Sequence, residues 1–479
     1  MLDILGPELR PTIELFSQEL LNQAMSAQAE GNLTEAWELY NAILGIHFDN
    51  PTVLYLTAEV ALKTGKFGLA INLLSRCVEL KPDFSEAWLN LGASLRNEYH
   101  VTQSRIALLK SLELKPTPQV YTNLSSLGAD SGNPREALMW LNKAEALDAG
   151  SADIHWNKSL AHLSLAEWDP GWKLYQYRKQ LKKDIRGQLW YPRDKIDAIE
   201  VSSIDDIRKA KRLYIHGEQG VGDEIMFMSC FSDMLRDCFG AVYVECERRL
   251  ERLFSRSWPS VTGWFTGQDQ AVKSGIKFDY KVSMGDLPML YRKRNEDFNG
   301  ASYLVPRLKQ SLDFKKKLAA LGPRPWIGMA WLGGTKVTRT HERSIPLGQW
   351  TPIQAGRTCV SLQYSPLGDQ GADEIGLPRF NGASNGTDID AQAALVEALD
   401  IVVTVTQTVY HIAGALGKRC IVLCPSSPDW RMGMQSDEFS RFDKLPWYQS
   451  LTVIRKKADE SWQTPLDVAA EIIEGMQCV

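Results

Sequence analysis

The chain has 479 residues, enough for roughly three domains, and its 44% hydrophobic and 23% charged residues are typical of a soluble globular protein. Its 54 basic and 58 acidic residues give a net charge of −4 without a basic tail, so nucleic acid is not expected as a main partner. No apolar run approaches the roughly 18 residues of a membrane span, no signal peptide is recognisable, and the eight cysteines form no CxxC pair. We therefore expect a cytoplasmic protein without a membrane span.

A small residue recurs along the first third of the chain at a nearly constant spacing. The positions are Ala36, Ala70, Ser104, Ala137 and Gly171, separated by 34, 34, 33 and 34 residues. This is the period of tetratricopeptide repeats, in which the two helices of a unit press together at a small residue. The pattern predicts an α-solenoid over residues 1–180. Its last unit ends at Asp169–Arg178, where extra aromatic residues indicate a cap against the next domain.

Such an array forms a concave groove, and its use stays open at this point. The groove holds a peptide or another protein, or the array is a rigid spacer or dimerising stack for the rest of the chain. The residues that follow, 181–210, are charged and irregular, which predicts a linker packed on the cap.

Strand and helix patterns alternate after the linker. We expect two Rossmann-like halves, over residues 211–310 and 311–479, that face each other across a cleft. The predicted strands are Leu213–Ile215, Ala241–Glu245, Tyr280–Val282, Trp326–Trp331, Cys359–Gln363, Ile401–Val405 and Cys420–Cys424, and the predicted helices are Phe314–Leu321 and Thr408–Leu416. The fold class is therefore multidomain α + α/β. Ligands of open α/β sheets bind beyond the carboxyl ends of the strands, so the turns that follow strands are the candidate sites.

The turn after the first of these strands is rich in glycine and acid. Its glycines are Gly217, Gly220 and Gly222, and its candidate bases are His216, Glu218 and Asp223. It has neither a Walker lysine nor a GxGxxG pattern, so it is not an ordinary nucleotide loop, and its carboxylates suggest acid/base chemistry. Asp223 is the first candidate for a general base. If Asp223 is not the base, Glu218 or His216 is the next candidate. The simpler alternative is that Asp223 is a first-turn carboxylate favoured by the helix dipole.

Two segments of the second half could bind an anion. One follows the strand at 326–331 and carries Gly333, Gly334, Lys336, Arg343 and Ser344. The alternative for this segment is a surface loop that binds nothing. The other is the turn Thr406, Gln407 and Thr408, which starts the helix that contains His411. Polar side chains there can cap the helix, and its first N–H groups favour a diphosphate. Cations opposite this helix start would complete a pyrophosphate-binding site without a metal. The alternative is that this segment is an ordinary capped helix in which His411 lies in the core.

Several segments together resemble a known family. They are HGEQGVGDEIMF, ERSIPL, HIAGALG, PDWR (Pro428–Arg431) and PWY (Pro446–Tyr448), which follow an array ending in GW-x-x-Y-x-x-R. In this order they resemble bacterial and phage tetratricopeptide proteins with a glycosyltransferase-like C-terminal region, which is similar to the lipopolysaccharide heptosyltransferases. The architecture also resembles the O-linked N-acetylglucosamine transferases, which join such repeats to a GT-B catalytic region.

The resemblance implies an inverting, metal-independent transfer of sugar from a nucleotide-diphosphate sugar to an acceptor hydroxyl, on a protein held by the repeats or on another acceptor. It implies Asp223 as general base, a donor-binding helix start at Thr406–Thr408 with His411, and a basic loop from Lys336 to Ser344. No metal and no cofactor besides the donor are expected. Many relatives carry Asp-Thr where this chain has Thr406-Gln407. Because threonine cannot accept from a sugar hydroxyl as a carboxylate does, the alternative is a non-catalytic repeat scaffold with a degenerate nucleotide-sugar fold.

Overall fold

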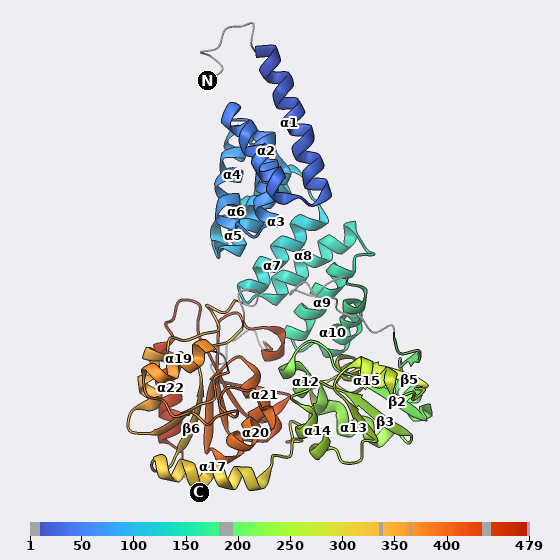
Figure 1. Ribbon diagram of the computed structural model, residues 1–479, viewed down its shortest axis with the longest axis vertical. Coiled ribbons are helices and arrows are strands. Elements are labelled where there is room, and N and C mark those ends of the chain that lie inside the picture. The colour runs from blue at the N-terminus through green and yellow to red at the C-terminus, as the bar shows by residue number, and fades with distance from the viewer. Residues whose placement is uncertain (1–9, 182–194, 335–338, 365, 434–441, 477–479) are drawn as a thin grey trace. The chain divides into compact units, whose positions relative to one another are not determined.

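The computed structural model describes residues 10–181, 195–334, 339–364, 366–433 and 442–476 (Figure 1). Contacts within the chain divide it into two units, Met1–Ile154 and His155–Val479. Among the described residues, no helix combines the length and the apolar character that crossing a membrane requires. The domain boundaries expected at residues 180, 210 and 310 remain predictions.

The first unit is built from helices that pack against one another in consecutive pairs (Figure 1). They are α1 (Arg10–Glu30), α2 (Leu33–Ile46), α3 (Pro51–Lys63), α4 (Phe67–Leu80), α5 (Ser85–Asn97), α6 (Val101–Leu114), α7 (Pro118–Asp130) and α8 (Pro134–Leu147). The recurring small residues of this unit are all buried in the second helix of a pair. The predicted run of repeating helices is therefore confirmed.

The turn inside a helix pair uses a left-handed residue. Gly31, Gly65 and Gly132 have φ angles of 84°, 72° and 70°, a region in which glycine meets no steric penalty. Tyr99 takes the corresponding place between α5 and α6 with a φ of 63°. The glycine pattern of the sequence skips this unit although the backbone keeps the same turn.

The last repeat-like helices lie in the second unit. These are α9 (Ala152–Ser164), which begins just before the division, α10 (Trp168–Tyr175) and the short 3-10 helix η2 (Gln176–Gln180). Gly171 sits where an added Cβ would lie 2.7 Å from Leu163 Cδ2, so the small residue again serves close helix packing. Trp168, Trp172 and Tyr175 are buried in the core of the second unit.

The second unit contains a five-stranded parallel sheet in the order β1-β5-β2-β3-β4. Its strands are β1 (Ile199–Glu200), β2 (Arg212–His216), β3 (Ala241–Glu245), β4 (Gly263–Phe265) and β5 (Tyr280–Ser283). The helices between them are α11 (Ile204–Lys209), α12 (Val221–Phe227), α13 (Phe231–Asp237), α14 (Glu251–Ser257) and α15 (Gln268–Lys273), with the 3-10 turn η3 (Met228–Cys230). After β5 come the 3-10 turn η4 (Met284–Asp286) and helix α16 (Leu287–Tyr291).

A six-stranded sheet follows in the order β10-β11-β9-β8-β6-β7, in which β10 pairs antiparallel with β11 and the remaining pairs are parallel. Its strands are β6 (Trp326–Ala330), β7 (Thr358–Ser361), β8 (Ile401–Val405), β9 (Cys420–Cys424), β10 (Phe442–Leu445) and β11 (Tyr448–Arg455). Its main helices are α17 (Leu308–Leu321), α18 (Thr351–Gln354), α19 (Pro366–Glu374), α20 (Ile389–Ala398), α21 (Thr408–Ala415) and α22 (Gln463–Glu474). Strands β8 and β9 are buried along their whole length, as expected of central parallel strands. The α/β character predicted after the repeats is confirmed.

Two parts of this region differ from the expectation. The segment read as a linker contributes the edge strand β1, which pairs with β5, and helix α11. Asp206 forms a capping box with Ser203 at the start of α11. Strands β1 and β4 have only two and three residues, too few for a hydrophobic alternation to mark them in the sequence.

Strand order reverses once in each sheet. From β2 the chain adds β3 and β4 on one side and then returns to place β5 on the other. In the second sheet β7 lies on one side of β6 and β8 on the other. Such a reversal leaves a crevice at the carboxyl edge, which is where ligands of open α/β sheets bind. The turns after β2, β5, β6 and β8 therefore lie at the two reversal points.

Candidate functional site

Two of these turns meet directly. Helix α12, which follows the turn after β2, packs against α21, which follows the turn after β8 (Figure 1). They come close at Gly222, where an added Cβ would lie 2.9 Å from His411 Cδ2 and 3.7 Å from Thr408 Cα. The glycine-rich turn and the helix start predicted as separate halves of a site are thus brought together at one contact.

Asp223 lies at this contact and is paired with an arginine of the second sheet's region. Arg431, in the 3-10 turn that follows β9, donates through Nε to Asp223 Oδ1 at 2.5 Å. The two side chains remain 19% and 18% exposed. Burial raises the pKa of Asp223, while the positive charge of Arg431 works in the opposite direction. Asp223 is therefore a partly exposed carboxylate that is held, in this structure, by a cation.

A second arginine stands close to the first. Arg343 donates from Nε to Thr406 Oγ1 at 3.0 Å and from Nη2 to the Thr406 carbonyl at 2.5 Å. Asp429 lies between the two arginines, 3.9 Å from Arg343 Nη2 and 3.7 Å from Arg431 Nη1. Burial alone would raise the pKa of Asp429, but Arg431 and Arg343 outweigh it and lower that pKa. We call Arg343 and Arg431 the arginine pair.

The loop that carries Arg343 is anchored at Gly333. Ser344 Oγ accepts from Gly333 N at 3.0 Å, and a Cβ at Gly333 would lie 2.7 Å from the Arg343 carbonyl oxygen. Gly334 has a φ of 73°, which favours glycine. Lys336, the remaining predicted cation, lies outside the described residues. Ser344 and the two glycines therefore shape the loop, and Arg343 is a charged group of its described part that lies at the site.

Helix α21 starts beside the arginine pair without a side-chain cap. Gln407 is its N-cap residue but makes no capping hydrogen bond, and its buried Oε1 has no hydrogen-bond partner among the described residues. Thr406 is 2% exposed and accepts from Arg343, so the expected capping by this turn is not found. The N–H of Tyr410 donates to the Gln407 carbonyl at 3.3 Å, so within the described residues the N–H groups of Thr408 and Val409 are the ones left for another acceptor.

His411 belongs to the core rather than to an open site. It is 4% exposed, and its Nδ1 lies 2.9 Å from the hydroxyl of Tyr448. Burial, with a smaller contribution from Arg431, lowers the pKa of His411 to about 3, so the ring is neutral at physiological pH. The core-histidine alternative describes its surroundings.

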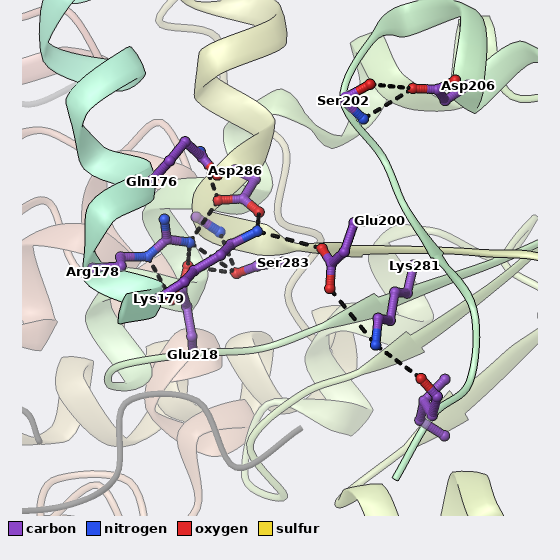
Figure 2. Close-up of polar contacts among 12 residues, drawn as sticks. Gln176, Arg178, Lys179, Glu200, Ser202, Asp206, Glu218, Lys281, Ser283 and Asp286 are labelled. Atoms are coloured by element: carbon purple, nitrogen blue, oxygen red, sulfur yellow. Dashed lines mark hydrogen bonds and ion pairs between the residues drawn. The ribbon is translucent and has the colours of Figure 1, made fainter. Parts of the chain in front are cut away.

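Glu218 and His216, the other candidate bases, are also buried. Arg178 of η2 donates from Nε to Glu218 Oε2 at 2.9 Å and from Nη2 to Asp286 Oδ1 at 2.7 Å, and Ser283 donates to Glu218 (Figure 2). Arg178 and His216 are 0% exposed and Glu218 is 6% exposed. Because the Glu218 carboxylate is buried and fully paired, it cannot reach the hydroxyl group of a sugar acceptor. Asp223 therefore remains the predicted base.

The ion-pair network around Arg178 extends to the edge of the sheet. Lys179 contacts Asp286 Oδ2 at 2.5 Å and Glu200 of β1 at 3.4 Å (Figure 2). Burial would raise the pKa of Asp286, but Arg178 and Lys179 hold it below its usual range. The network thereby joins the glycine-rich turn, through Glu218, to three segments that are distant in the sequence: η2, the end of β5 and strand β1.

Several of these residues were not predicted as site residues. They are Arg178, Asp429 and Arg431. Arg178 and Arg431 close two segments that the sequence did single out, GW-x-x-Y-x-x-R and PDWR. Their partners lie 40 and 208 residues away, which no local pattern reveals.

We expect Gly222→Ala to lower the free energy of unfolding of the second unit by about 1–3 kcal/mol, because the added methyl group would crowd the His411 ring. The helical propensity gained by alanine, about 1 kcal/mol, offsets only part of this. Denaturant unfolding of the full chain measures the change. The matched control is Gly348→Ala, since an added Cβ there meets nothing within 4 Å. Equal stability of the two variants would contradict the close packing of α12 on α21.

No family model matches the chain. Protein FlbA of Caulobacter vibrioides is 27% identical over 407 residues, which are 80% of this chain and 66% of FlbA, so the chain spans just under two thirds of that relative.

Three solved structures resemble the chain over about a third of its length. The thermophilic TPR protein TTC0263 of Thermus thermophilus matches 36% of this chain and 94% of its own, with 20% identity and a TM-score of 0.31. MamA of Desulfovibrio magneticus RS-1 matches 34% of this chain and 92% of its own, with 15% identity and a TM-score of 0.31. YrrB, described as a TPR protein with an unusual peptide-binding site, matches 33% and 82%, with 16% identity and a TM-score of 0.30.

Proposed function

We propose that the second unit binds a nucleotide-diphosphate sugar at the contact between α12 and α21 and transfers the sugar to an acceptor hydroxyl. One observation carries this proposal: the arginine pair meets the start of α21, which has no side-chain cap, beside the partly exposed carboxylate of Asp223. Together these groups form an anion site next to a base, at the carboxyl edge of both sheets.

The arginine pair and the helix start suit a diphosphate. Guanidinium groups bind phosphate oxygens through two parallel N–H bonds, and the first N–H groups of a helix favour an anion. Arg343 and Arg431 are each 19% exposed, so they can reach a ligand while most of each side chain stays fixed. Positive charge held in this way would stabilise the departing diphosphate without a divalent ion.

Asp223 must leave Arg431 before it can act as a base. We propose that the donor diphosphate competes for Arg431 and so releases the carboxylate. Asp223 then takes the proton of the acceptor hydroxyl, whose oxygen bonds to the anomeric carbon while the bond from that carbon to the diphosphate oxygen breaks. The nucleoside diphosphate leaves, and the configuration at the anomeric carbon of the sugar is inverted. The raised pKa of Asp223, caused by burial, suits proton acceptance.

The Thr406 replacement has a structural role in this proposal. Its hydroxyl and carbonyl both accept from Arg343, so the residue orients one member of the arginine pair instead of contacting a sugar hydroxyl. The helices of the first unit would hold the acceptor protein or peptide, which is the usual work of such arrays.

Calorimetric titration with UDP, ADP, GDP and CDP tests the donor site. We expect one of these nucleotides to bind the full chain and Arg343→Gln to weaken that binding about 10- to 100-fold, because a charge-assisted hydrogen bond contributes roughly 1.5–3 kcal/mol. Arg324→Gln is the matched control, since Arg324 pairs with Asp400 on the opposite, amino-terminal side of β6 and β8. If none of the four binds, or if Arg343→Gln binds as tightly as the wild type, the transferase proposal is wrong.

A non-catalytic scaffold is the second candidate, and a specific observation favours it. Both Asp223 and Glu218 are held by arginines, and α12 packs directly on α21 at Gly222. In addition, a cavity of about 750 Å³ beside α13 and α16 is lined by none of the predicted site residues. A rigid adaptor needs such packing and no open donor site. Absence of nucleotide binding and of sugar turnover would support it.

A further inference from the structure

We infer that Tyr175 and Gln219 are positioning residues that hold Arg431 ready for the diphosphate, so that the helix ending the repeat-like segment sets the affinity of the anion site. This inference rests on the proposed function and adds to it two residues that touch neither the donor nor the reacting atoms. It is carried by a chain of hydrogen bonds from α10 through the glycine-rich turn to Arg431.

Gln219 is the strained residue of the glycine-rich turn. Its φ is 68°, whereas none of the three glycines of that turn has a positive φ. A left-handed conformation costs a non-glycine residue about 1–2 kcal/mol and persists only where surrounding contacts fix it. A glutamine at this position therefore indicates that its side chain is needed there.

The two ends of the Gln219 amide have defined partners. Its Oε1 accepts from Arg431 Nη2 at 3.1 Å, and its Nε2 donates to the hydroxyl of Tyr175. Because a guanidinium has only donors, the amide oxygen must face Arg431, which directs the amide nitrogen to Tyr175. The amide thus joins α10 to Arg431 in a single orientation.

Tyr175 provides a fixed end for this chain. It is 0% exposed, its ring lies 5.3 Å from Trp172 and 5.9 Å from Trp430 between centroids, and the Arg178 guanidinium stands 4.5 Å over it. The Arg431 guanidinium lies 4.7 Å over the ring of Trp430. One buried aromatic cluster therefore fixes both ends of the Gln219 link.

The link matters most when Asp223 is displaced. Arg431 then loses its hydrogen bond to Asp223 but keeps the bond to Gln219 and the nearby charge of Asp429, so its side chain does not have to be ordered by the ligand. Ordering one long side chain on binding weakens an interaction by about 2- to 10-fold. Removal of the Tyr175 hydroxyl should reduce anion affinity by that factor through Arg431 alone.

The test is a double-mutant cycle on the full chain with inorganic pyrophosphate as the calorimetric probe. Tyr175→Phe, which keeps the ring, should weaken pyrophosphate binding about 2- to 10-fold in the wild-type background and cause no further loss in Arg431→Gln. Gln219→Met, which removes both hydrogen bonds, should give the same pattern and serves if Tyr175→Phe lowers the melting temperature. Tyr291→Phe is the control, since its hydroxyl contacts Asp237 instead.

The outcomes separate the two proposals. If the wild type binds pyrophosphate and Tyr175→Phe binds equally well, the positioning role is wrong and the proposed function stands. If Tyr175→Phe weakens binding equally with and without Arg431, the effect is a general loss of packing and the positioning role is again wrong. If the wild type binds neither pyrophosphate nor a nucleoside diphosphate, both proposals are overturned.

Discussion

Replacement of Arg178 by methionine is expected to lower the free energy of unfolding of the second unit by about 3–5 kcal/mol. The side chain is 0% exposed and neutralises two buried carboxylates, Glu218 and Asp286. Methionine fills a similar volume but leaves Glu218 without a cation, and removing one partner of a buried pair costs far more than the intact pair contributes. Denaturant unfolding of the full chain measures the loss.

The pH dependence of this loss identifies its cause. In the wild type Arg178 and Lys179 hold the pKa of Asp286 below its unfolded value of about 3.9, so the stability that this group contributes is present above that pH and declines below it. In Arg178→Met the carboxylates are buried with less positive charge, which raises their pKa values, and protonation relieves part of the cost. The deficit should therefore shrink as the pH falls from 7 towards 4.

Two further variants serve as controls for Arg178→Met. Arg208→Met removes a cation that is 51% exposed beside Asp237, and little change is expected there. Adding Glu218→Gln and Asp286→Asn to Arg178→Met should restore part of the lost stability. A deficit that is independent of pH and unaffected by these two neutral substitutions would show that lost packing, and not uncompensated charge, is responsible.

Asp223→Asn is expected to reduce sugar transfer about 10²- to 10⁴-fold with the nucleotide sugar that the wild type uses. The slow hydrolysis of that nucleotide sugar should fall as well. Asparagine keeps the shape of the side chain but cannot take a proton from an acceptor hydroxyl. Nucleoside diphosphate binding should be retained or tightened, because Arg431 would lose a charged competitor for the phosphate. Turnover is followed by release of the nucleoside diphosphate, and binding by calorimetry.

The matched control for Asp223→Asn is Asp205→Asn, which alters an exposed carboxylate in the first turn of α11. Turnover by Asp223→Asn equal to that of this control would remove Asp223 from the proposed mechanism. Weakened nucleotide binding by Asp223→Asn would mean that the carboxylate supports the anion site and does not compete with it.

Local patterns predicted the elements that depend on neighbours in the sequence. Strands β3, β8 and β9 have the predicted bounds, because each is a short apolar run that polar or turn residues end on both sides. Helix α21 begins at Thr408 as expected, since Thr406 and Gln407 break the apolar pattern. Repeating helices followed from the spacing of small residues such as Ala36 and Ala70, which are fully buried.

Residues whose role depends on tertiary pairing were not predicted. Arg431 and Asp223 are 208 residues apart, and Arg178 and Glu218 are 40 residues apart in different elements. The sequence showed that these charges exist but not that they neutralise each other. The left-handed conformation of Gln219 was not predicted either, because it depends on Tyr175 and Arg431, which hold the Gln219 side chain.

The buried position of Arg178 also bears on how such a chain could be lengthened or shortened during evolution. A cut at residue 180 would remove Arg178. The buried carboxylates of Glu218 and Asp286 would then be left without this cation. A junction near residue 154, where the two units divide, leaves that cation in place. Duplication or deletion of upstream helix pairs could therefore change the length of the array while the α/β region is inherited intact.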